Sequence, residues 1–391
     1  MRRIGIDVIG LAVPESYLEL ADLAQARGVQ PSKYIEGLGV TRMAIALPHE
    51  DPVSLAAEAG RRALAPVDKS RIGLCVVGSE TGVDHSKPIA VWVHKLLGLP
   101  QQCRVYESKH ACYGGTAGVL TALDWIASGS ARGRSALIIC SDIARYELGS
   151  PGEPTQGAGA VAMVISEEPR LLALEPGVSG AFAREVDDFW RPIYRREALT
   201  DGHYSVQCYL DSLAGAYGAW KEQAGDGAPL ARRCYHVPYG KMARKAHRHA
   251  MQLDGLPEAE ADATFAAQVA PSLRIPSQVG NIYTGSLWMA LASLLEAEAA
   301  QLAGQRVGLF SYGSGCMAEF FAGTVADEAG AFAAQLQISG ALERRRRLSF
   351  AEYEAIRRAD SEADKRAAVE APGQGAAFLG LREEKRVYRA P

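Results

Sequence analysis

Residues 108–118 read Ser108-Lys109-His110-Ala111-Cys112-Tyr113-Gly114-Gly115-Thr116-Ala117-Gly118, a polar stretch that turns into a helix of small residues. The helical pattern continues over residues 113–127. Around it, short apolar runs bounded by glycine and polar residues predict buried strands at 72–77, 136–140 and 160–165. Strands that alternate with helices in this way indicate an α/β fold with buried sheets.

The same order returns in the second half of the chain. The predicted strands there cover residues 233–237, 307–310 and 318–324, and the predicted helix covers 287–299. From the helix start at Asn281 to the next strand there are 26 residues (307 − 281), against 24 (136 − 112) from Cys112 in the first half. This weak repeat predicts a duplicated fold. It places Cys112 and Asn281 at equivalent helix starts, where both can face one cleft.

The composition excludes several classes of protein. The 391 residues are 48% hydrophobic and 22% charged, and the formal net charge is -3. That charge does not suit nucleic acid or a polybasic membrane anchor, and no apolar run reaches the roughly 18 residues of a membrane span. Seven cysteines without a C-x-x-C pair fit a reducing compartment rather than a disulfide framework or a zinc site. We therefore expect a soluble, cytoplasmic protein with no metal, no nucleic-acid partner and no membrane attachment.

Three residues are candidates for chemistry because of where they stand. Cys112 lies at a helix start, whose free N–H groups are expected to lower the pKa of a thiol. Glu80 follows the strand at 72–77, and strand ends in α/β folds commonly present catalytic groups. His236 stands in an aromatic strand end. The residues alone leave the structural alternatives open: a packed cysteine, a solvated carboxylate and a packed or capping histidine.

Charged and glycine-rich segments give further candidates. Lys241, Arg244, Lys245 and Arg248 follow one another at helical spacing and form a basic face, which either meets phosphates or is only solvated. Ser311-Tyr312-Gly313-Ser314-Gly315 follows a strand, and its backbone N–H groups can contribute to an oxyanion hole. The run Arg344 to Arg347 stands next to acidic residues and is expected to be a solvated helix face.

Several segments together resemble one known family. They are Ala111-Cys112-Tyr113, Glu153-Pro154-Thr155-Gln156-Gly157-Ala158-Gly159, Asp188-Phe189-Trp190-Arg191-Pro192, His236-Val237-Pro238, Gly280-Asn281-Ile282-Tyr283-Thr284-Gly285-Ser286-Leu287 and Ser311-Tyr312-Gly313-Ser314-Gly315. In this order, over nearly the whole chain, they resemble 3-hydroxy-3-methylglutaryl-CoA (HMG-CoA) synthase in its bacterial form. The resemblance implies a thiolase-like fold with a layered α/β/α/β/α core and a homodimer. It divides the chain into two similar halves, residues 1–168 and 169–391.

The resemblance also implies roles for particular residues. Cys112 is the nucleophile that acetyl-CoA acylates, Glu80 is the base that takes a proton from the acetyl methyl group, and His236 is the acid or hydrogen-bond donor on the ketone of acetoacetyl-CoA. The N–H groups of Cys112 and Ser314 are implied to stabilise the enolate oxygen, and Asn281 to hold the second substrate. The CoA thioesters are substrates, and no cofactor is implied.

A further set of residues is implied to bind substrate. Tyr146, Thr155, Ser205, Lys241 and Lys245 resemble positions that line the site or the CoA channel, and Gln30 and Pro31 lie in a segment near the adenine end of CoA. Two positions depart from the family's usual residues. The family commonly has Asp where Gln30 stands, and its bacterial members commonly have Glu where His110 stands.

The rival function is the same aldol step on acyl-carrier-protein thioesters, as in polyketide β-branching. Residues 112–118 somewhat resemble such enzymes, whereas residues 142–146 and 153–155 look more like members of the primary mevalonate pathway of isoprenoid biosynthesis. An acidic carrier protein needs a basic patch at the tunnel mouth, and the helix from Lys241 suits either partner. A non-catalytic subunit of this fold typically lacks the nucleophile, whereas Cys112, Glu80 and His236 are all present. A cysteine hydrolase is a further alternative, but apart from the family resemblance the sequence does not show the ordered Cys–His–carboxylate set that such enzymes use.

Overall fold

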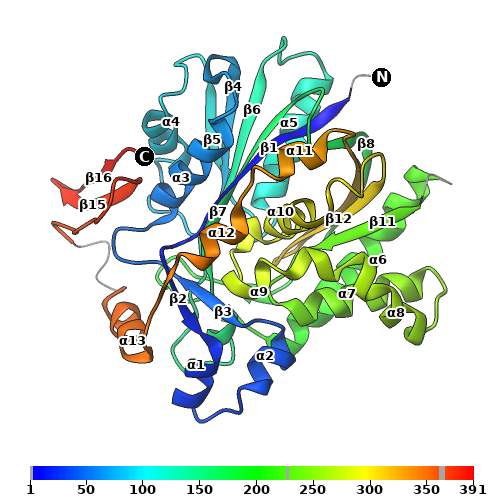
Figure 1. The fold of residues 1–391 in the computed structure, drawn as a ribbon. Coiled ribbons are helices and arrows are strands. Elements are labelled where there is room, and N and C mark those ends of the chain that lie inside the picture. Colours follow the sequence, from blue (N-terminus) through cyan, green and yellow to red (C-terminus); the bar gives the residue numbers. More distant parts are fainter. Residues whose placement is uncertain (1–2, 226–228, 361–365) are drawn as a thin grey trace.

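The computed structural model describes residues 3–225, 229–360 and 366–391. At its centre lies a nine-stranded sheet of mixed direction (Figure 1). In spatial order its strands are β11 (Leu230–Tyr235), β12 (Arg306–Gly313), β13 (Met317–Val325), β8 (Leu172–Ala183), β1 (Ile4–Ala12), β7 (Ala158–Glu167), β6 (Ser135–Ile143), β4 (Ile72–Gly78) and β5 (Arg104–Ser108). β1 pairs antiparallel with both β7 and β8, so one sheet runs through both halves of the chain.

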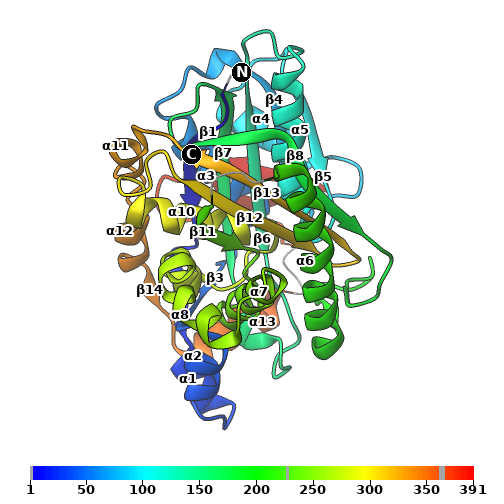
Figure 2. The same cartoon turned by 90° about the vertical axis from the view of Figure 1, so that its right-hand side faces the viewer.

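Helices cover both faces of this sheet (Figures 1 and 2). The Trp288 ring of α10 (Ser286–Glu298) lies 6.2 Å from Phe321, whereas the Trp220 ring of α6 (Gly202–Ala224) lies 4.8 Å from Phe320. Because successive strand residues point to opposite faces, α10 and α6 lie on opposite sides of β13.

The first half repeats this arrangement. A Cβ at Gly118 of α5 (Gly114–Ala127) would lie 3.1 Å from Ile138, and one at Gly60 of α3 (Pro52–Leu64) would lie 3.3 Å from Ile139. α5 and α3 therefore lie on opposite sides of β6. The strand registers place α5 and α10 on the same face of the continuous sheet. These two helices form the inner layer, and α3, α4 (Ile89–Leu97) and α6 form the outer ones, as the predicted layered fold requires.

The remaining helices surround this core. They are α1 (Leu20–Ala26), α2 (Ser32–Leu38), α7 (Gly240–Leu253), α8 (Glu258–Gln268), α9 (Pro276–Val279), α11 (Ala329–Ala333), α12 (Ile338–Glu343) and α13 (Phe350–Ala359), with 3-10 turns at Lys69–Arg71, Glu153–Thr155, Ala270–Leu273 and Tyr283–Gly285. Among the described residues, no helix is both long and apolar enough to span a bilayer. Nor do three or more His, Cys, Asp or Glu side chains in the described ranges gather as metal ligands.

The predicted elements are confirmed, with two corrections. All six predicted strands and the helical stretches predicted at 113–127 and 287–299 are present within three residues of their predicted ends, but the helix start predicted at Asn281 lies five residues before α10, which begins at Ser286. The Arg344 to Arg347 run is not a solvated helix face: α12 ends at Glu343, and Arg346–Arg347 form β14, which pairs with β2 (Ser16–Glu19) beside β3 (Arg42–Ile45). Arg345 is only 7% exposed. β14 and β2 are about 330 residues apart in the sequence, so no local sequence pattern predicts that they pair.

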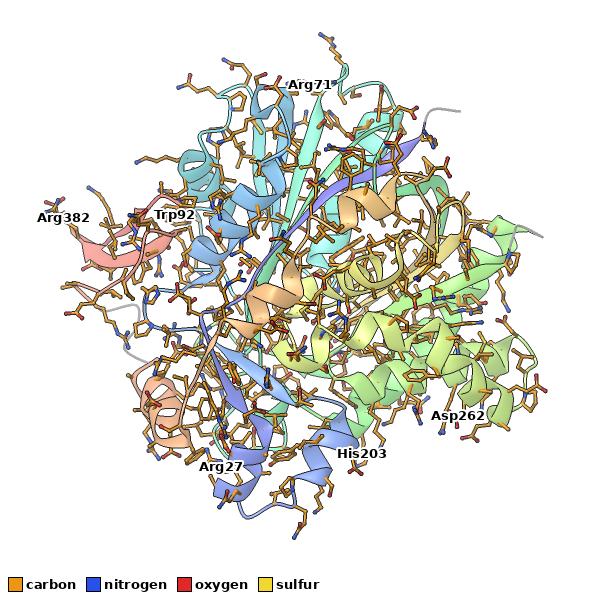
Figure 3. All side chains as sticks on the ribbon, viewed as in Figure 1. Arg27, Arg71, Trp92, His203, Asp262 and Arg382 are labelled. Carbon is orange, nitrogen blue, oxygen red and sulfur yellow. The ribbon has the colours of Figure 1, made fainter. Side chains whose placement is uncertain are left out.

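A C-terminal hairpin covers the first half from the outside. β15 (Ala377–Arg382) and β16 (Lys385–Arg389) pair antiparallel, and the Tyr388 ring lies 6.3 Å from Trp92, which is labelled beside the hairpin in Figure 3. The Asp51 carboxylate, which caps α3, accepts hydrogen bonds from Arg386 and from the Tyr388 hydroxyl. These contacts fix the hairpin as one wall of the cleft that contains Glu80.

Small residues allow α5 to approach the sheet ends closely. A Cβ at Gly115 would lie 2.2 Å from Cys140 Sγ, and one at Gly78 would lie 2.4 Å from the Gly115 nitrogen. A Cβ at Gly313 would lie 2.6 Å from the Tyr113 nitrogen. Larger side chains at these positions would push apart β4, β12 and the segment that carries Cys112.

Candidate active site

Glu80 and Cys112 meet at the carboxyl end of β4. Glu80 lies two residues beyond this strand, and Cys112 lies two residues before α5. The Cys112 thiol donates a hydrogen bond to Glu80 Oε1 across 3.3 Å. Cys112 is 9% exposed, and the Glu80 side chain is 6% exposed. The fold thus places a thiol, in a position to act as a nucleophile, against a carboxyl group inside a shielded site.

The surroundings of Glu80 suit a proton acceptor. Burial raises the pKa of its carboxyl to about 8, and the nearby Asp142 carboxylate adds to the rise. The Arg191 guanidinium and the Cys112 thiol lower the pKa and so oppose this effect. Arg191 Nη2 donates to the Glu80 carbonyl oxygen and lies 3.4 Å from Glu80 Oε2. A general base works best when its pKa is close to the operating pH.

The electrostatics of Cys112 differ from the sequence expectation. Burial, followed by the charge of Glu80, raises the pKa of the Cys112 thiol well above its ordinary value. The predicted lowering by a helix start is wrong, because α5 begins at Gly114 with Tyr113 as its N-cap. Desolvation and a neighbouring anion both disfavour the thiolate. The resting site therefore holds a neutral thiol.

Asp142 is a site residue to which the sequence analysis gave no role. This fully buried residue of β6 accepts hydrogen bonds from Ser79 Oγ, from the Glu80 N–H and from the Thr81 N–H and hydroxyl. Its other oxygen accepts from the Thr284 N–H and hydroxyl. Asp142 therefore ties the Glu80 loop of the first half to the segment that follows Asn281 in the second. The one sequence signal that could have marked Asp142 as a site residue is its position just after the apolar strand predicted at 136–140.

His236 lies just past the end of β11, as predicted, and is 3% exposed. A chain of contacts runs from it towards Cys112: Tyr209 packs against both His236 and Tyr312, and the Tyr312 hydroxyl donates to Asp188. The charge of Asp188 contributes to the raised pKa of Cys112. Burial lowers the pKa of His236 to about 3. Desolvation disfavours the charged imidazolium, and no charge among the described residues offsets it. A neutral imidazole still donates one N–H hydrogen bond.

Aromatic rings cover the Cys112 side chain. Cys112 packs with Tyr283, and Phe189 packs against both. The Phe189 ring lies 5.7 Å from Tyr283 and 6.2 Å from Tyr146. Tyr146, a predicted site residue, is therefore brought to the wall of the site.

Thr155 and Asn281 are joined through the backbone. The Asn281 N–H donates to the Thr155 carbonyl oxygen across 3.0 Å. Asn281 is 2% exposed, and its side-chain oxygen accepts from the Tyr283 N–H and the Ser286 hydroxyl. These bonds hold the Asn281 side chain against the turn that carries Tyr283, which lies in the same buried cluster as Cys112.

Ser205 and the Ser311 to Gly315 loop are linked by Asp188. This fully buried carboxylate accepts from the Gly315 N–H at 3.0 Å and from the Ser205 hydroxyl at 3.3 Å. Ser314 lines the same cleft as Glu80. Asp188 had been noted only as part of a motif, and the structure shows that it holds the loop that carries Ser314.

Four predicted substrate-binding residues lie where α2 packs against α7, away from Cys112. They are Gln30 and Pro31, which precede α2, and Lys241 and Lys245, which belong to α7. A Cβ at Gly240 would lie 2.8 Å from the Gly39 carbonyl oxygen. In the described ranges, none of these four residues has a recorded contact with Cys112 or Glu80.

The predicted basic face of α7 is only partly available. Arg248 pairs with Asp262 at 2.5 Å and with Glu258 at 2.9 Å, so it faces α8, where Figure 3 labels Asp262. The Arg244 guanidinium lies 4.8 Å from the Phe265 ring centre. Lys241 and Lys245 have no ion pair within the described part of the chain. The free cationic groups of this helix are therefore these two lysines.

A cleft of about 1080 Å³ reaches the site from the side of the C-terminal hairpin. Glu80, Arg191 and Ser314 lie in its wall, and Phe378 and Arg386 of the hairpin line its outer part. It is a space large enough for a substrate-sized group.

Comparison with known proteins agrees with this geometry. Models of the hydroxymethylglutaryl-coenzyme A synthase N terminal and C terminal match residues 1–169 and 249–374. A hydroxymethylglutaryl-CoA synthase from Enterococcus faecalis is 40% identical over 355 residues, which cover 90% of this chain and 91% of the relative. The structure of MvaS in complex with 3-hydroxy-3-methylglutaryl coenzyme A has a TM-score of 0.94 and 48% identity, and covers 100% of this chain and 99% of its own. The curacin-pathway HMG synthase with holo donor-ACP has a TM-score of 0.95 and 33% identity, with 100% of both chains covered.

The fold and the paired cysteine and glutamate define a class, the condensing enzymes that transfer acyl groups on a thiolase-like fold. Within this class, the chain belongs to the hydroxymethylglutaryl-CoA synthase family, as the sequence resemblance predicted.

Proposed function

We propose that this chain joins acetyl-CoA to acetoacetyl-CoA and releases HMG-CoA, with the acetyl group carried on Cys112. The observation that carries the proposal is the 3.3 Å contact between the Cys112 thiol and Glu80 Oε1. A thioester formed on this sulfur holds its methyl group close to a carboxylate that can take a proton from it. Covalent catalysis of this kind divides one difficult condensation into easier steps.

The steps follow from the groups present. The Cys112 sulfur attacks the acetyl carbonyl, and CoA leaves as the thiol. The Glu80 carboxylate removes a methyl proton, and the resulting enolate carbon bonds to the ketone carbon of acetoacetyl-CoA. The ketone oxygen gains a proton, and His236 supplies the hydrogen bond or proton at that oxygen. Water then cleaves the bond to Cys112, which leaves a free carboxylate on HMG-CoA.

Stabilisation of the enolate oxygen is assigned to the N–H groups of Cys112 and Ser314. The close approach of Gly313 to Tyr113 supports this assignment, because it brings the two backbone segments together. Backbone N–H groups that point at a developing oxyanion are commonly the largest electrostatic contribution to catalysis. Asn281 and Thr155, which share a backbone hydrogen bond, are assigned to hold the second substrate.

The CoA moiety is assigned to the surface between α2 and α7. Gln30 and Pro31 lie on one side of it. Lys241 and Lys245 lie on the other, and their ammonium groups form no ion pair with a described residue. Lysine binds phosphate as a point charge. Tyr146 and Ser205 are assigned to the channel between this surface and Cys112.

Carrier-protein thioesters are the second candidate substrates, because the curacin-pathway neighbour was solved with a donor acyl carrier protein. The α7 surface favours free CoA: two unpaired lysines suit a phosphorylated nucleotide, whereas an acidic carrier protein needs a wider basic patch. The test compares acetyl transfer to Cys112 from acetyl-CoA and from an acetylated carrier protein, followed by intact-protein mass spectrometry. Faster transfer from CoA supports the proposal, and transfer from the carrier protein alone overturns it.

We propose that each chain consists of two similar halves, residues 1–168 and 169–391. Two such chains are proposed to form a homodimer, located in the cytoplasm. β5 ends the nine-stranded sheet, and its free backbone edge supports pairing with a second copy. All seven cysteines are free thiols, which supports a reducing compartment. Light scattering on the purified chain tests the dimer, and a monomeric mass would overturn it.

A further inference from the structure

Arg191 lies beside Oε2 of Glu80, the carboxylate oxygen to which the proposed mechanism gives no role. Its Nη2 donates to the Glu80 carbonyl oxygen and lies 3.4 Å from Oε2, while the Cys112 thiol contacts the other carboxylate oxygen, Oε1. The two contacts leave Oε1 facing the sulfur and Oε2 facing the guanidinium. The Arg191 side chain is 14% exposed, so solvent screens this ion pair little.

The backbone on both sides of Arg191 is held in place. Asp188 accepts hydrogen bonds from Tyr312 at 2.6 Å and from the Gly315 N–H at 3.0 Å. Phe189–Trp190 form β9, which pairs with β10 (Leu199–Thr200). The loop therefore presents the guanidinium from a fixed base, rather than as a freely moving surface arginine.

The charges around Glu80 give this contact its importance. Asp142 on β6 is an anion close to Glu80, and the thiol of Cys112 and the hydroxyls of Tyr146 and Tyr283 are neutral. In the described part of the chain, Arg191 is the one cation with a recorded ion pair to Glu80. Without it, a buried carboxylate would face only another carboxylate and neutral groups.

We propose that Arg191 is a positioning residue that holds Glu80 as a carboxylate turned towards Cys112, and so makes the base form available for proton removal from the acetyl group. The inference rests on the proposed function, to which it adds a counter-ion for Glu80 that makes no bond to the substrate. The proton moves from the acetyl methyl carbon to Glu80 Oε1, and the electron pair stays on the enolate. Arg191 keeps its own protons throughout.

The direction of its effect follows from electrostatics. Arg191 lowers the pKa of Glu80 against the rise caused by burial and Asp142. An opposite charge at this distance commonly changes a carboxyl pKa by about 1–3 pH units, and each unit changes the base fraction about tenfold below the pKa. Removal of the guanidinium should therefore move the pH profile of condensation to higher pH.

The test is a single-turnover measurement. Cys112 is first acetylated, acetoacetyl-CoA is then added, and the condensation rate is followed across neutral and alkaline pH for the wild type, Arg191→Gln, Arg191→Lys and Arg184→Gln. Arg184 precedes the same segment and forms an exposed ion pair with Asp211 at 3.1 Å, outside the residues that line the cleft, so it is the matched control. We expect Arg191→Gln to lose about tenfold or more at neutral pH and to recover at alkaline pH. Arg191→Lys should restore most of the rate, and Arg184→Gln should match the wild type.

Two results would overturn the inference. One is an unchanged pH profile in Arg191→Gln, and the other is an equal loss at every pH that Arg191→Lys does not restore, as a purely structural role would give. Glu80→Gln, measured in parallel, separates this failure from failure of the proposed function. If Glu80→Gln condenses normally, the proposed function is wrong. If only Arg191→Gln behaves as the wild type, the inference alone fails.

Discussion

The thiol of Cys112 donates its hydrogen bond to Oε1 of Glu80 across 3.3 Å, although 32 positions separate the two residues. In the free enzyme this bond lowers the pKa of Glu80, while the Glu80 charge raises that of Cys112. Acetylation of the sulfur removes the thiol proton and leaves Oε1 without this donor. The same carboxylate oxygen then becomes available to accept a proton from the acetyl methyl group. One pair of residues can therefore serve both the acyl-transfer step and the enolisation step.

The first prediction concerns the nucleophile. Cys112→Ser should abolish acetyl transfer, because a serine hydroxyl gives up its proton far less readily than a cysteine thiol and is a much weaker nucleophile. Intact-protein mass spectrometry after incubation with acetyl-CoA checks this. Cys140→Ser, at another buried thiol, is the control and should still gain the acetyl mass. Normal condensation by Cys112→Ser would contradict the assignment.

The second prediction concerns pH. The pKa of Glu80 is raised to about 8, so its base form is scarce at low pH and grows as the pH rises through that value. Condensation from preformed acetyl-enzyme should therefore speed up with increasing pH and level off above about 8. His236, whose pKa is lowered to about 3, stays neutral in this range and should add no inflection near its ordinary value. A profile that falls through neutral pH would show that a protonated histidine is needed.

The third prediction separates His236 from Asn281. His236→Ala should leave Cys112 acetylation largely intact and slow condensation by roughly 10²–10³-fold, the usual loss when one hydrogen-bond donor to a developing oxyanion is removed. Asn281→Ala should be milder, because its side chain is assigned to hold the second substrate and not to stabilise the developing alkoxide. Acetylation and condensation are measured separately in both variants. A loss below about tenfold for His236→Ala would leave that residue with a structural role only.

The fourth prediction concerns stability. Arg27, labelled in Figure 3 between α1 and α13, donates to both oxygens of Glu153, a carboxylate that is 1% exposed. Arg27→Ala leaves that buried charge unpaired and should cost about 3–5 kcal/mol of unfolding free energy. Arg3→Ala breaks the exposed pair with Glu168 and should cost about 0–1 kcal/mol. Urea denaturation at equal protein concentration measures both, and equal losses would contradict the account.

Local patterns in the sequence were sufficient for the alternating strands and helices and for two of the candidate site residues, whereas the layered arrangement was implied by the family resemblance. Apolar runs predicted β4, β6 and β12, and the turn into small residues marked Cys112 before α5. The family resemblance supplied the pairing of Glu80 with Cys112, since nothing in a 32-residue spacing specifies a 3.3 Å contact. What could not be predicted depends on tertiary surroundings. The predicted lowering of the Cys112 pKa was wrong, and the lowered pKa of His236 was not foreseen, because burial determines both.

The residues that support the site were also hidden from sequence. Asp142 bonds to Thr284 from 142 positions away, and Arg191 reaches Glu80 from 111 positions away. Both stood in or beside recognised motifs, yet their partners could be named only once the chain was folded. Arg345 shows the same limit, because its burial follows from the pairing of β14 with β2.

The most direct test of the central claim is Glu80→Ala, with acetylation and condensation measured in one experiment. Acetylation of Cys112 should persist, because removal of the carboxylate also removes a charge that raises the pKa of the thiol. Formation of the carbon–carbon bond should be lost, since enolisation needs a base at the acetyl methyl group. The account predicts that mass spectrometry finds an acetyl group on Cys112 that acetoacetyl-CoA does not convert to HMG-CoA. A folded Glu80→Ala enzyme that either fails to acetylate Cys112 or condenses at the wild-type rate would contradict it.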